Sequence, residues 1–152
     1  MTTTPRLSGP PRGSAAPELV ESGFALENAD APFLHDGLNL ADIAHVLDLR
    51  RRNLIPETAA RDLQRLLLEA YATDAASFPY DPAFGEPYNS RERFFVERLG
   101  DVAGWLHAGR PRREAARIAL RLYIRRQLLE LVDEVASFAR HATDLAGRHV
   151  GT

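Results

Sequence analysis

The sequence predicts an all-α fold, and three observations carry that prediction. Apolar residues recur at intervals of three and four over several segments, which is the spacing of one helix face. No segment alternates apolar and polar residues with the period of a strand. Proline stands at the start of two of the segments, where a helix tolerates it. The predicted helices are residues 38–52, 56–72, 90–107 and 111–146.

Length and composition describe an ordinary soluble domain. The chain has 152 residues, 45% of them hydrophobic, which is enough for one domain with its own core. The formal net charge is −2, so any binding of polyanions must come from a local patch. All 19 basic residues are arginine, and arginine suits bidentate recognition of carboxylates and phosphates.

The same composition excludes several classes of site. The chain has no cysteine, which excludes disulfides, thiolate metal sites and cysteine nucleophiles and is compatible with the cytoplasm. The first residues have no apolar core of a signal peptide, and no apolar run reaches the roughly 20 residues that span a bilayer. We therefore expect a cytoplasmic protein that does not bind a membrane.

Three regions are expected along the chain. Residues 1–17 are rich in Thr, Pro, Gly and Ser, which predicts a disordered tail. Residues 18–109 are predicted to form an N-terminal helical domain, and residues 110–152 a long bundle helix. Within the first domain, residues 18–37 mix apolar and acidic residues without a clean period. This stretch is expected to be irregular, packing through Phe24, Leu26, Phe33 and Leu34.

The first two predicted helices should form an antiparallel hairpin. Asn39 is a plausible N-cap of the helix at 38–52, and Arg50 to Arg52 lie at its dipole-favoured C-terminal end. Pro56 stands at or near the first position of the next helix, whose apolar stripe includes Leu63 and Leu67. The connection between the two helices is short, which favours antiparallel packing.

An ordered loop and a third helix follow. Residues 77–89 hold several prolines and aromatic residues, so we expect a loop whose rings cover part of the core. The third helix is predicted from Ser90 to His107, and its Gly100 and Gly104 would let another helix approach closely. It should stop at Gly109.

The fourth predicted helix is the largest feature of the sequence. No breaker occurs from Pro111 to Ala146, and a helix of about 36 residues measures about 54 Å. Its apolar residues occupy more than one side, and three shorter helices cannot cover so long a rod. We infer that another chain buries it; the alternative is a monomer with a projecting helix. The apolar positions are Ile118, Leu122, Leu128, Leu129, Leu131, Val132, Val135, Ala136, Phe138, Ala139 and Ala146.

The sequence offers few groups for catalysis. No two of the five histidines have the spacing of four that places two imidazoles on one metal ion, so no metal site is expected. Arginines at every fourth position, from Arg113 to Arg125, form a basic ridge on the long helix. The ridge could meet carboxylates of a partner helix, an anionic ligand or nucleic acid, or be a solvated surface. Nucleic acid is disfavoured by the net charge and by the absence of a helix-turn-helix pattern.

The segment "HAGRP", residues 107–111, is more specific. A glycine turn that leads into a helix N-terminus presents free N–H groups and a partial positive charge. Arg110 and Arg112 flank this turn, an arrangement that could hold a small dicarboxylate.

Residues 97–131, "ERLGDVAGWLHAGRPRREAARIALRLYIRRQLLEL", resemble the first signature region of argininosuccinate lyase, in the aspartase/fumarase superfamily. In that family the pattern includes His-Thr-Gly-Arg-Ser-Arg-Asn-Asp-Gln before a long helix. The upstream segments "IAHVLDL" and "NLIPETAARDLQRLL" also resemble the family's early helical hairpin, so the resemblance covers residues 38–150. The matching positions are Gly100, Gly104, His107, Gly109, Arg110 and Arg112.

The resemblance implies a substrate-binding turn without a catalytic residue. His107, Gly109, Arg110, Arg112 and Arg113 would contact a succinyl-type substrate, and no cofactor is implied. Several neighbours depart from the family pattern, and the aligned stretch "YNSRE" lacks the family's upstream histidine. The departures are Ala108 for Thr, Pro111 for Ser, Arg113 for Asn, Glu114 for Asp and Ala115 for Gln.

The resemblance also implies that the chain is the N-terminal part of a longer lyase, whose central domain would begin, truncated, at residues 110–152. The family's other two signature regions carry a Thr-His pair and a Gly-Ser-Ser-x-Met-Pro-x-Lys loop with the serine base. This chain has no lysine, and its only methionine is Met1, so that loop is absent. The expected function is one part of a fumarate-releasing C–N lyase, inactive alone, that works with a lyase-like second chain or as a homo-oligomer. The alternative is a non-catalytic, lyase-derived interaction or regulatory subunit.

Overall fold

The structure is a computed structural model that describes residues 15–151. All secondary structure within this range is helical, which confirms the predicted all-α class. The predicted tail at residues 1–17 lies mostly outside the described range, and Pro17 already begins the first helix. The elements are α1 (Pro17–Leu19), η1 (Val20–Phe24), α2 (Ala25–Ala29), α3 (Ala31–Arg51), α4 (Glu57–Ala72), η2 (Pro82–Phe84), α5 (Pro87–Leu99), η3 (Gly100–His107) and α6 (Arg112–Arg148).

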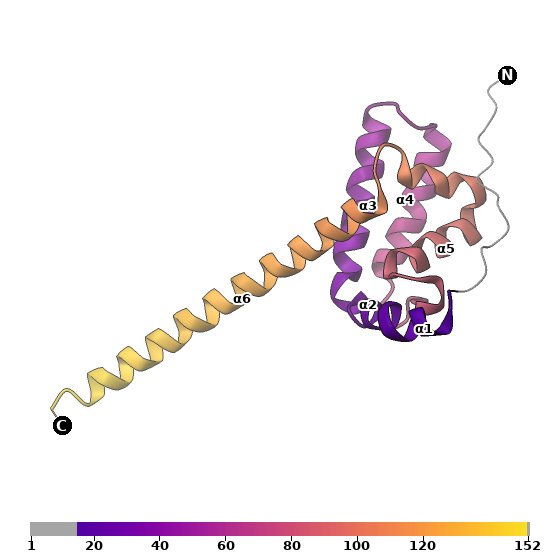
Figure 1. Cartoon of the computed structure of the whole chain (residues 1–152). Helices are drawn as coiled ribbons and strands as arrows, with labels where there is room; N and C mark the ends of the chain where they lie inside the picture. Colours follow the sequence, from indigo (N-terminus) through magenta and orange to yellow (C-terminus); the bar gives the residue numbers. More distant parts are fainter. Residues whose placement is uncertain (1–14, 152) are drawn as a thin grey trace, which may run out of the picture.

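The elements from α1 to η3 form the body of the protein, and α6 crosses α3 and then projects away from it (Figure 1). Helices α3 and α4 lie side by side around a short connection, as predicted for the hairpin. In that connection Asn53 takes φ +55°, the left-handed conformation that asparagine tolerates. The main core lies between α3, α4, α5 and η3. Its buried residues include Val46, Leu49, Ile55, Leu63, Leu66, Leu67, Phe78, Phe95 and Leu106.

The expectation of irregular chain over residues 18–37 is wrong, because this stretch is almost entirely helical. Helix α3 begins at Ala31, with Pro32 in its first turn, a position that proline favours. Asn39 is therefore not an N-cap; it lies inside α3 and is fully buried. The buried face of α3 also carries His35 and Asp42, so its helical period does not show in the apolar residues alone.

Of the four side chains expected to pack against the body from residues 18–37, two do so and two are exposed. Phe24 and Leu34 are partly buried against the body. Leu26 and Phe33 are 69% and 56% exposed, and the ring of Phe33 lies 5.4 Å from the ring of Tyr123 on α6, measured between centroids. Helix α2 and the first turn of α3 thus leave apolar side chains on the surface.

The third predicted helix is divided in two. Helix α5 begins three residues before Ser90, at Pro87, and ends at Leu99. The next residue, Gly100, has a φ of +54°, which an L side chain rarely adopts. The chain then continues to His107 as the 3₁₀ helix η3. A Cβ on Gly100 would meet nothing within 4 Å, so this glycine serves backbone conformation and not the close helix approach that was expected.

The close approach occurs instead between α3 and α6. A Cβ on Gly37 would lie 2.6 Å from the Cα of Ala119, a distance that real Cβ atoms do not show. Ala115 and Ala119 are the only buried residues of α6 within the described chain, and both face α3. Three small residues thus set the point at which α6 crosses the body.

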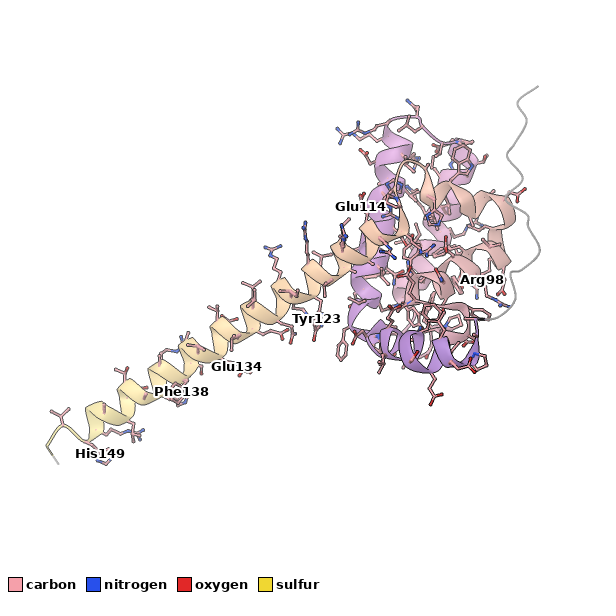
Figure 2. The ribbon with its side chains drawn as sticks, viewed as in Figure 1. Arg98, Glu114, Tyr123, Glu134, Phe138 and His149 are labelled. Atoms are coloured by element: carbon pink, nitrogen blue, oxygen red, sulfur yellow. The ribbon has the colours of Figure 1, made fainter. Side chains whose placement is uncertain are left out.

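Helix α6 continues well beyond that crossing. It has 37 residues, or about 55 Å, and agrees with the predicted helix at 111–146 to within two residues at each end. Tyr123 lies where α6 leaves the body, whereas Glu134 and Phe138 lie on the projecting part (Figure 2). Phe138 is 75% exposed. Its apolar neighbours on α6, such as Leu131 and Val135, are exposed to a smaller extent. Burial of this part by another chain stays a prediction. No described helix is both long and apolar enough to cross a membrane.

We expect Gly37→Val to loosen the crossing of α3 and α6, because the new side chain would overlap the backbone at Ala119. Overpacking of this kind costs about 1–3 kcal/mol of unfolding free energy, measured as the midpoint of urea denaturation. Gly147→Ala, on the open part of α6, is the matched control and should lose no stability. Equal midpoints for both variants would contradict a tight crossing.

Candidate functional site

The turn singled out in the sequence lies between η3 and α6, next to the middle of α3. Gly109 takes φ +69°, and a Cβ there would meet nothing, so the backbone conformation alone requires glycine. The amide of Arg110 donates to the carbonyl of His107 at 3.2 Å and closes the turn. Pro111 then stands directly before the first turn of α6, and its ring fixes its own φ at −75°.

His107 lies at the edge of this turn in a half-buried position. Its Nε2 lies 2.6 Å from Oε1 of Glu92 on α5. Its ring meets the ring of Tyr88 edge-on, with centroids 5.9 Å apart. Two contacts therefore orient the imidazole, and one of its partners, Tyr88, is itself buried.

Arg112 and Arg113 begin α6 on the exposed side of the turn. Nε of Arg112 donates to Oε1 of Glu86 at 2.5 Å, and this hydrogen bond raises the pKa of Arg112 above its ordinary value. Arg113 is exposed and makes no ion pair with any residue that the structure describes. Arg113 is thus the free cation of the turn, whereas Arg112 shares its charge with a carboxylate.

Arg110 points the other way, into the body. It is only 5% exposed, and its guanidinium donates to a carboxylate oxygen of Asp42 and, at 3.1 Å, to the carbonyl of Ala41. A further contact joins it to the hydroxyl of Tyr88 at 3.3 Å. The structure therefore gives Arg110 a place in the core, where it holds the turn on α3.

Asp42 stands at the centre of a buried polar network that the sequence reasoning missed. Oδ2 accepts from Nη2 of Arg91 at 2.8 Å, and Oδ1 accepts from the hydroxyl of Tyr88 at 2.9 Å as well as from Arg110. Nη1 of Arg91 donates to Asn39 at 2.9 Å. Burial is the largest influence on the pKa of Arg91 and lowers it, but Asp42 together with Tyr80 and Tyr88 raises it by more, so the net pKa is raised. One carboxylate thus joins α3, α5 and the turn.

The network continues to His35 at the other end of α3. Nε2 of His35 lies 3.0 Å from the carbonyl of Thr73, so it carries the proton, and Nδ1 accepts from the hydroxyl of Tyr80 at 2.9 Å. Burial, and then the charge of Arg91, lower the pKa of His35. This histidine is a neutral structural group. A signal for it did exist, namely polar residues recurring at 35, 39 and 42 with helical spacing.

The exposed side of the turn is suited to an anion. The free N–H groups of the first turn of α6, the guanidinium of Arg113 and the remaining N–H groups of Arg112 lie at one helix N-terminus. Glu86 competes for Arg112, so an anionic ligand must share or replace that contact. No cluster of three potential metal ligands occurs within residues 15–151.

Comparison with curated proteins gives a consistent set of relatives. The chain is 30% identical over 114 residues to the argininosuccinate lyase of Methanoculleus marisnigri, a match that covers 74% of this chain. It is 33% identical over 113 residues to the argininosuccinate lyase of Anaeromyxobacter sp. strain K, and 27% identical over 136 residues to that of Methanospirillum hungatei. The chain is a relative of argininosuccinate lyase.

The match is partial with respect to those argininosuccinate lyases. It covers 74% to 89% of this chain but only 23% to 27% of these three relatives. The chain therefore spans about a quarter of their length, which fits the predicted N-terminal part. No protein-family model matches the chain, and no solved structure matches it.

We expect Asp42→Ala to destabilise this argininosuccinate lyase relative strongly, because it would leave the guanidiniums of Arg91 and Arg110 buried without a counter-charge. Breaking a buried pair in this way costs about 3–5 kcal/mol of unfolding free energy. The measurement is urea denaturation followed by circular dichroism. Asp48→Ala, which removes an exposed pair with Arg52, is the control and should cost no more than about 1 kcal/mol.

Stability should also fall as pH falls from 7.5 to 5.5. The folded-state pKa of His35 is lowered, so below its ordinary pKa the unfolded chain binds a proton that the folded chain does not. His35→Gln should reduce the slope of unfolding free energy against pH, whereas His141→Gln, on the projecting part of α6, should keep it. The measurement is the urea midpoint at three pH values, and an unchanged slope in the His35 variant would contradict the assignment.

Proposed function

We propose that the chain is one part of an argininosuccinate-lyase-like carbon–nitrogen lyase that releases fumarate by β-elimination from a succinyl-type substrate. The proposal includes a cytoplasmic location, and it assigns this chain the binding of the substrate's carboxylates. The observation that carries it is the match to argininosuccinate lyases over 74% of the chain together with the anion-suited turn at the start of α6.

The structure divides the proposed binding residues into two groups by their surroundings. Arg112, Arg113 and the backbone after Gly109 lie on the exposed side and are the groups that could contact a carboxylate. Arg110 acts through the backbone as a positioning residue, because its guanidinium is bound to Asp42. His107 borders the same turn, oriented by Glu92.

Arg113 is the position at which this turn would differ most from the family pattern, where an uncharged asparagine stands. An exposed guanidinium without an ion-pair partner among the described residues adds a full positive charge beside the α6 N-terminus. The proposed pocket therefore favours a substrate with at least two carboxylates. A neutral substrate would gain nothing from that charge.

The given residues include neither the family's Ser loop with its general base nor its Thr-His region. In our proposal a second chain supplies both. The projecting part of α6, with exposed Leu128, Leu131, Val135 and Phe138, is the surface on which such a chain would pack. In the proposal, a second chain packed along α6 would place its Ser loop and Thr-His region beside the turn at the start of α6.

The test is co-expression of this chain with the companion polypeptide of its genome that carries the Thr-His and Ser-loop regions. We expect fumarate release from argininosuccinate, followed by ultraviolet absorbance, only when both chains are present. Arg113→Gln should raise KM by about tenfold, as expected for one lost charge-assisted contact worth about 1.5 kcal/mol, with a smaller change in kcat. Arg93→Gln, on the exposed surface of α5, is the control and should leave KM unchanged. A stable complex without fumarate release would contradict the catalytic proposal.

The second candidate is a regulatory subunit derived from such a lyase. The observation that favours it is the departure from the family pattern around the turn, where Pro111 and Arg113 replace the Ser and Asn of the family's substrate-contacting Ser-Arg-Asn triplet. A regulatory chain would change the rate of a complete argininosuccinate lyase when mixed with it. A required part of a split enzyme would instead be needed for any activity at all.

A further inference from the structure

A recess that is open to solvent lies between the beginning of α3 and the first third of α6. Its volume is about 420 Å³, within the range of about 300–1,000 Å³ that pockets for small ligands occupy. Tyr123, the lining residue farthest along α6, stands where this helix leaves the body (Figure 2). No residue of the turn at 107–113 borders the recess, so it is separate from the candidate site described above. Its lining includes Asp30, Phe33, Leu34, Arg117, Leu120 and Tyr123.

The carboxylate of Asp30 lacks the partner that its position normally supplies. Asp30 is the N-cap of α3, where an aspartate side chain usually accepts from the amide at the second or third helix position. Here the second position is Pro32, which has no N–H, and the amide of Phe33 donates to the backbone carbonyl of Asp30 at 3.0 Å. No side-chain hydrogen bond or ion pair joins Asp30 to any residue that the structure describes. Its negative charge is therefore available to a ligand in the recess.

The guanidinium of Arg117 is likewise without an ion pair or side-chain hydrogen bond within residues 15–151. Arg113 and Arg121, four positions before and after it, carry the same charge and repel it. Asp30 and Arg117 line the same recess, yet no ion pair joins them, so more than 4.0 Å separates their charged atoms. The recess thus has a negative group on its α3 side and a positive group on its α6 side, with space between them.

The surroundings strengthen this division of charge. On the α3 side, Asp30 also borders a smaller recess together with Glu27, and no arginine or lysine occurs between residues 15 and 49. On the α6 side, Arg117 belongs to the basic ridge. A ligand with a single charge, of either sign, would be attracted to one side of the recess and repelled by the other. The electrostatics therefore favour a small ligand that carries both charges.

Apolar side chains form the rest of the lining. Phe33 and Leu120 are 56% and 47% exposed, and the rings of Phe33 and Tyr123 lie next to each other at the open side. Leu34 is partly buried behind them. A further aromatic ring packed on this pair would gain stacking energy in addition to the burial of apolar area. The third part of a fitting ligand is therefore an aromatic side chain.

We infer that this recess binds a free α-amino acid with an aromatic side chain. Its ammonium group pairs with Asp30, its carboxylate pairs with Arg117, and its ring packs against Phe33 and Tyr123. An α-amino acid carries both charges on one carbon, so a single small molecule satisfies the two unpaired groups and covers the exposed rings. A peptide segment would bring at most one charged terminus to the same place and would leave the other group unpaired.

The bound amino acid would bridge α3 and α6, in addition to the direct contact of these helices at Gly37 and Ala119. The inference does not rest on the proposed lyase function, because it uses neither the turn nor a second chain. It assigns this chain a second ligand site, for a zwitterion with an apolar side chain, whereas the turn is proposed to bind carboxylates.

The test is equilibrium dialysis of the full chain against radiolabelled L-phenylalanine, with the site located by amide chemical shifts of ¹⁵N-labelled protein. A ligand of this size should bind with a Kd of about 1 mM or below. The amides that shift should lie at residues 30–34 and 116–123. N-acetyl-L-phenylalanine lacks the ammonium charge and L-phenylalaninamide lacks the carboxylate. Each should bind about tenfold more weakly, as expected for one lost charge-assisted contact.

Substitutions assign each charge to its partner. Asp30→Asn should weaken the binding of L-phenylalanine about tenfold but should not weaken that of the N-acetyl analogue, which has no ammonium group to lose a partner. Arg117→Gln should do the same for L-phenylalanine and spare the amide analogue. Asp36→Asn and Arg125→Gln are the matched controls, because they remove the same charges from exposed positions on the same helices outside the recess. Both should bind like the wild type.

All four substituted side chains are exposed, and circular dichroism verifies that each variant is folded. Absence of binding at about ten times the expected Kd overturns the inference. So do equal affinities for L-phenylalanine and its two analogues, or unchanged binding in the Asp30 and Arg117 variants. Shifts confined to residues 107–113 would also overturn it, since they would report a carboxylate bound at the turn and leave the proposed function intact.

Discussion

The buried carboxylate of Asp42 is the interaction on which the rest of the structure depends. It lies on α3 and is fully enclosed, and it binds guanidiniums that arrive from α5 and from the turn before α6. Two cations around one anion leave a net positive charge in the core, which is partly solvated by the hydroxyl oxygen of Tyr88, accepting from Arg110, and by the amide oxygen of Asn39, accepting from Arg91. Buried charges of this kind are tolerated only when they are paired and hydrogen-bonded, so the three elements must fold together.

This constraint has a direct consequence for the turn. Because Arg110 is anchored on α3, its neighbours on the exposed side, Arg112 and Arg113, are held at a fixed place at the start of α6. The same anchor, with the crossing at Gly37 and Ala119, sets the direction in which α6 leaves the body. The position of the helix end that we propose binds an anion and the direction of the projecting helix therefore both depend on one core contact.

The sequence predicted the elements whose apolar residues repeat with helical period, namely α4, the second half of α3 and the whole of α6. It failed where the buried face is polar: His35, Asn39 and Asp42 define the inner side of α3, and an apolar pattern does not reveal them. It also treated Gly100 as a packing residue, because a positive φ leaves no mark in the sequence. The turn was located correctly, but the inward direction of Arg110 depends on a tertiary partner 68 residues away.

Native-state hydrogen exchange tests the central claim most directly. If Asp42 joins α3, α5 and the entry of α6 into one cooperative unit, then amides of Val46, Phe95 and Ala119 should open with the same free energy, equal to that of global unfolding. The projecting part of α6 should exchange much faster in the isolated monomer. A first part of α6 that opens at low free energy, while α3 and α5 stay protected, would contradict the account.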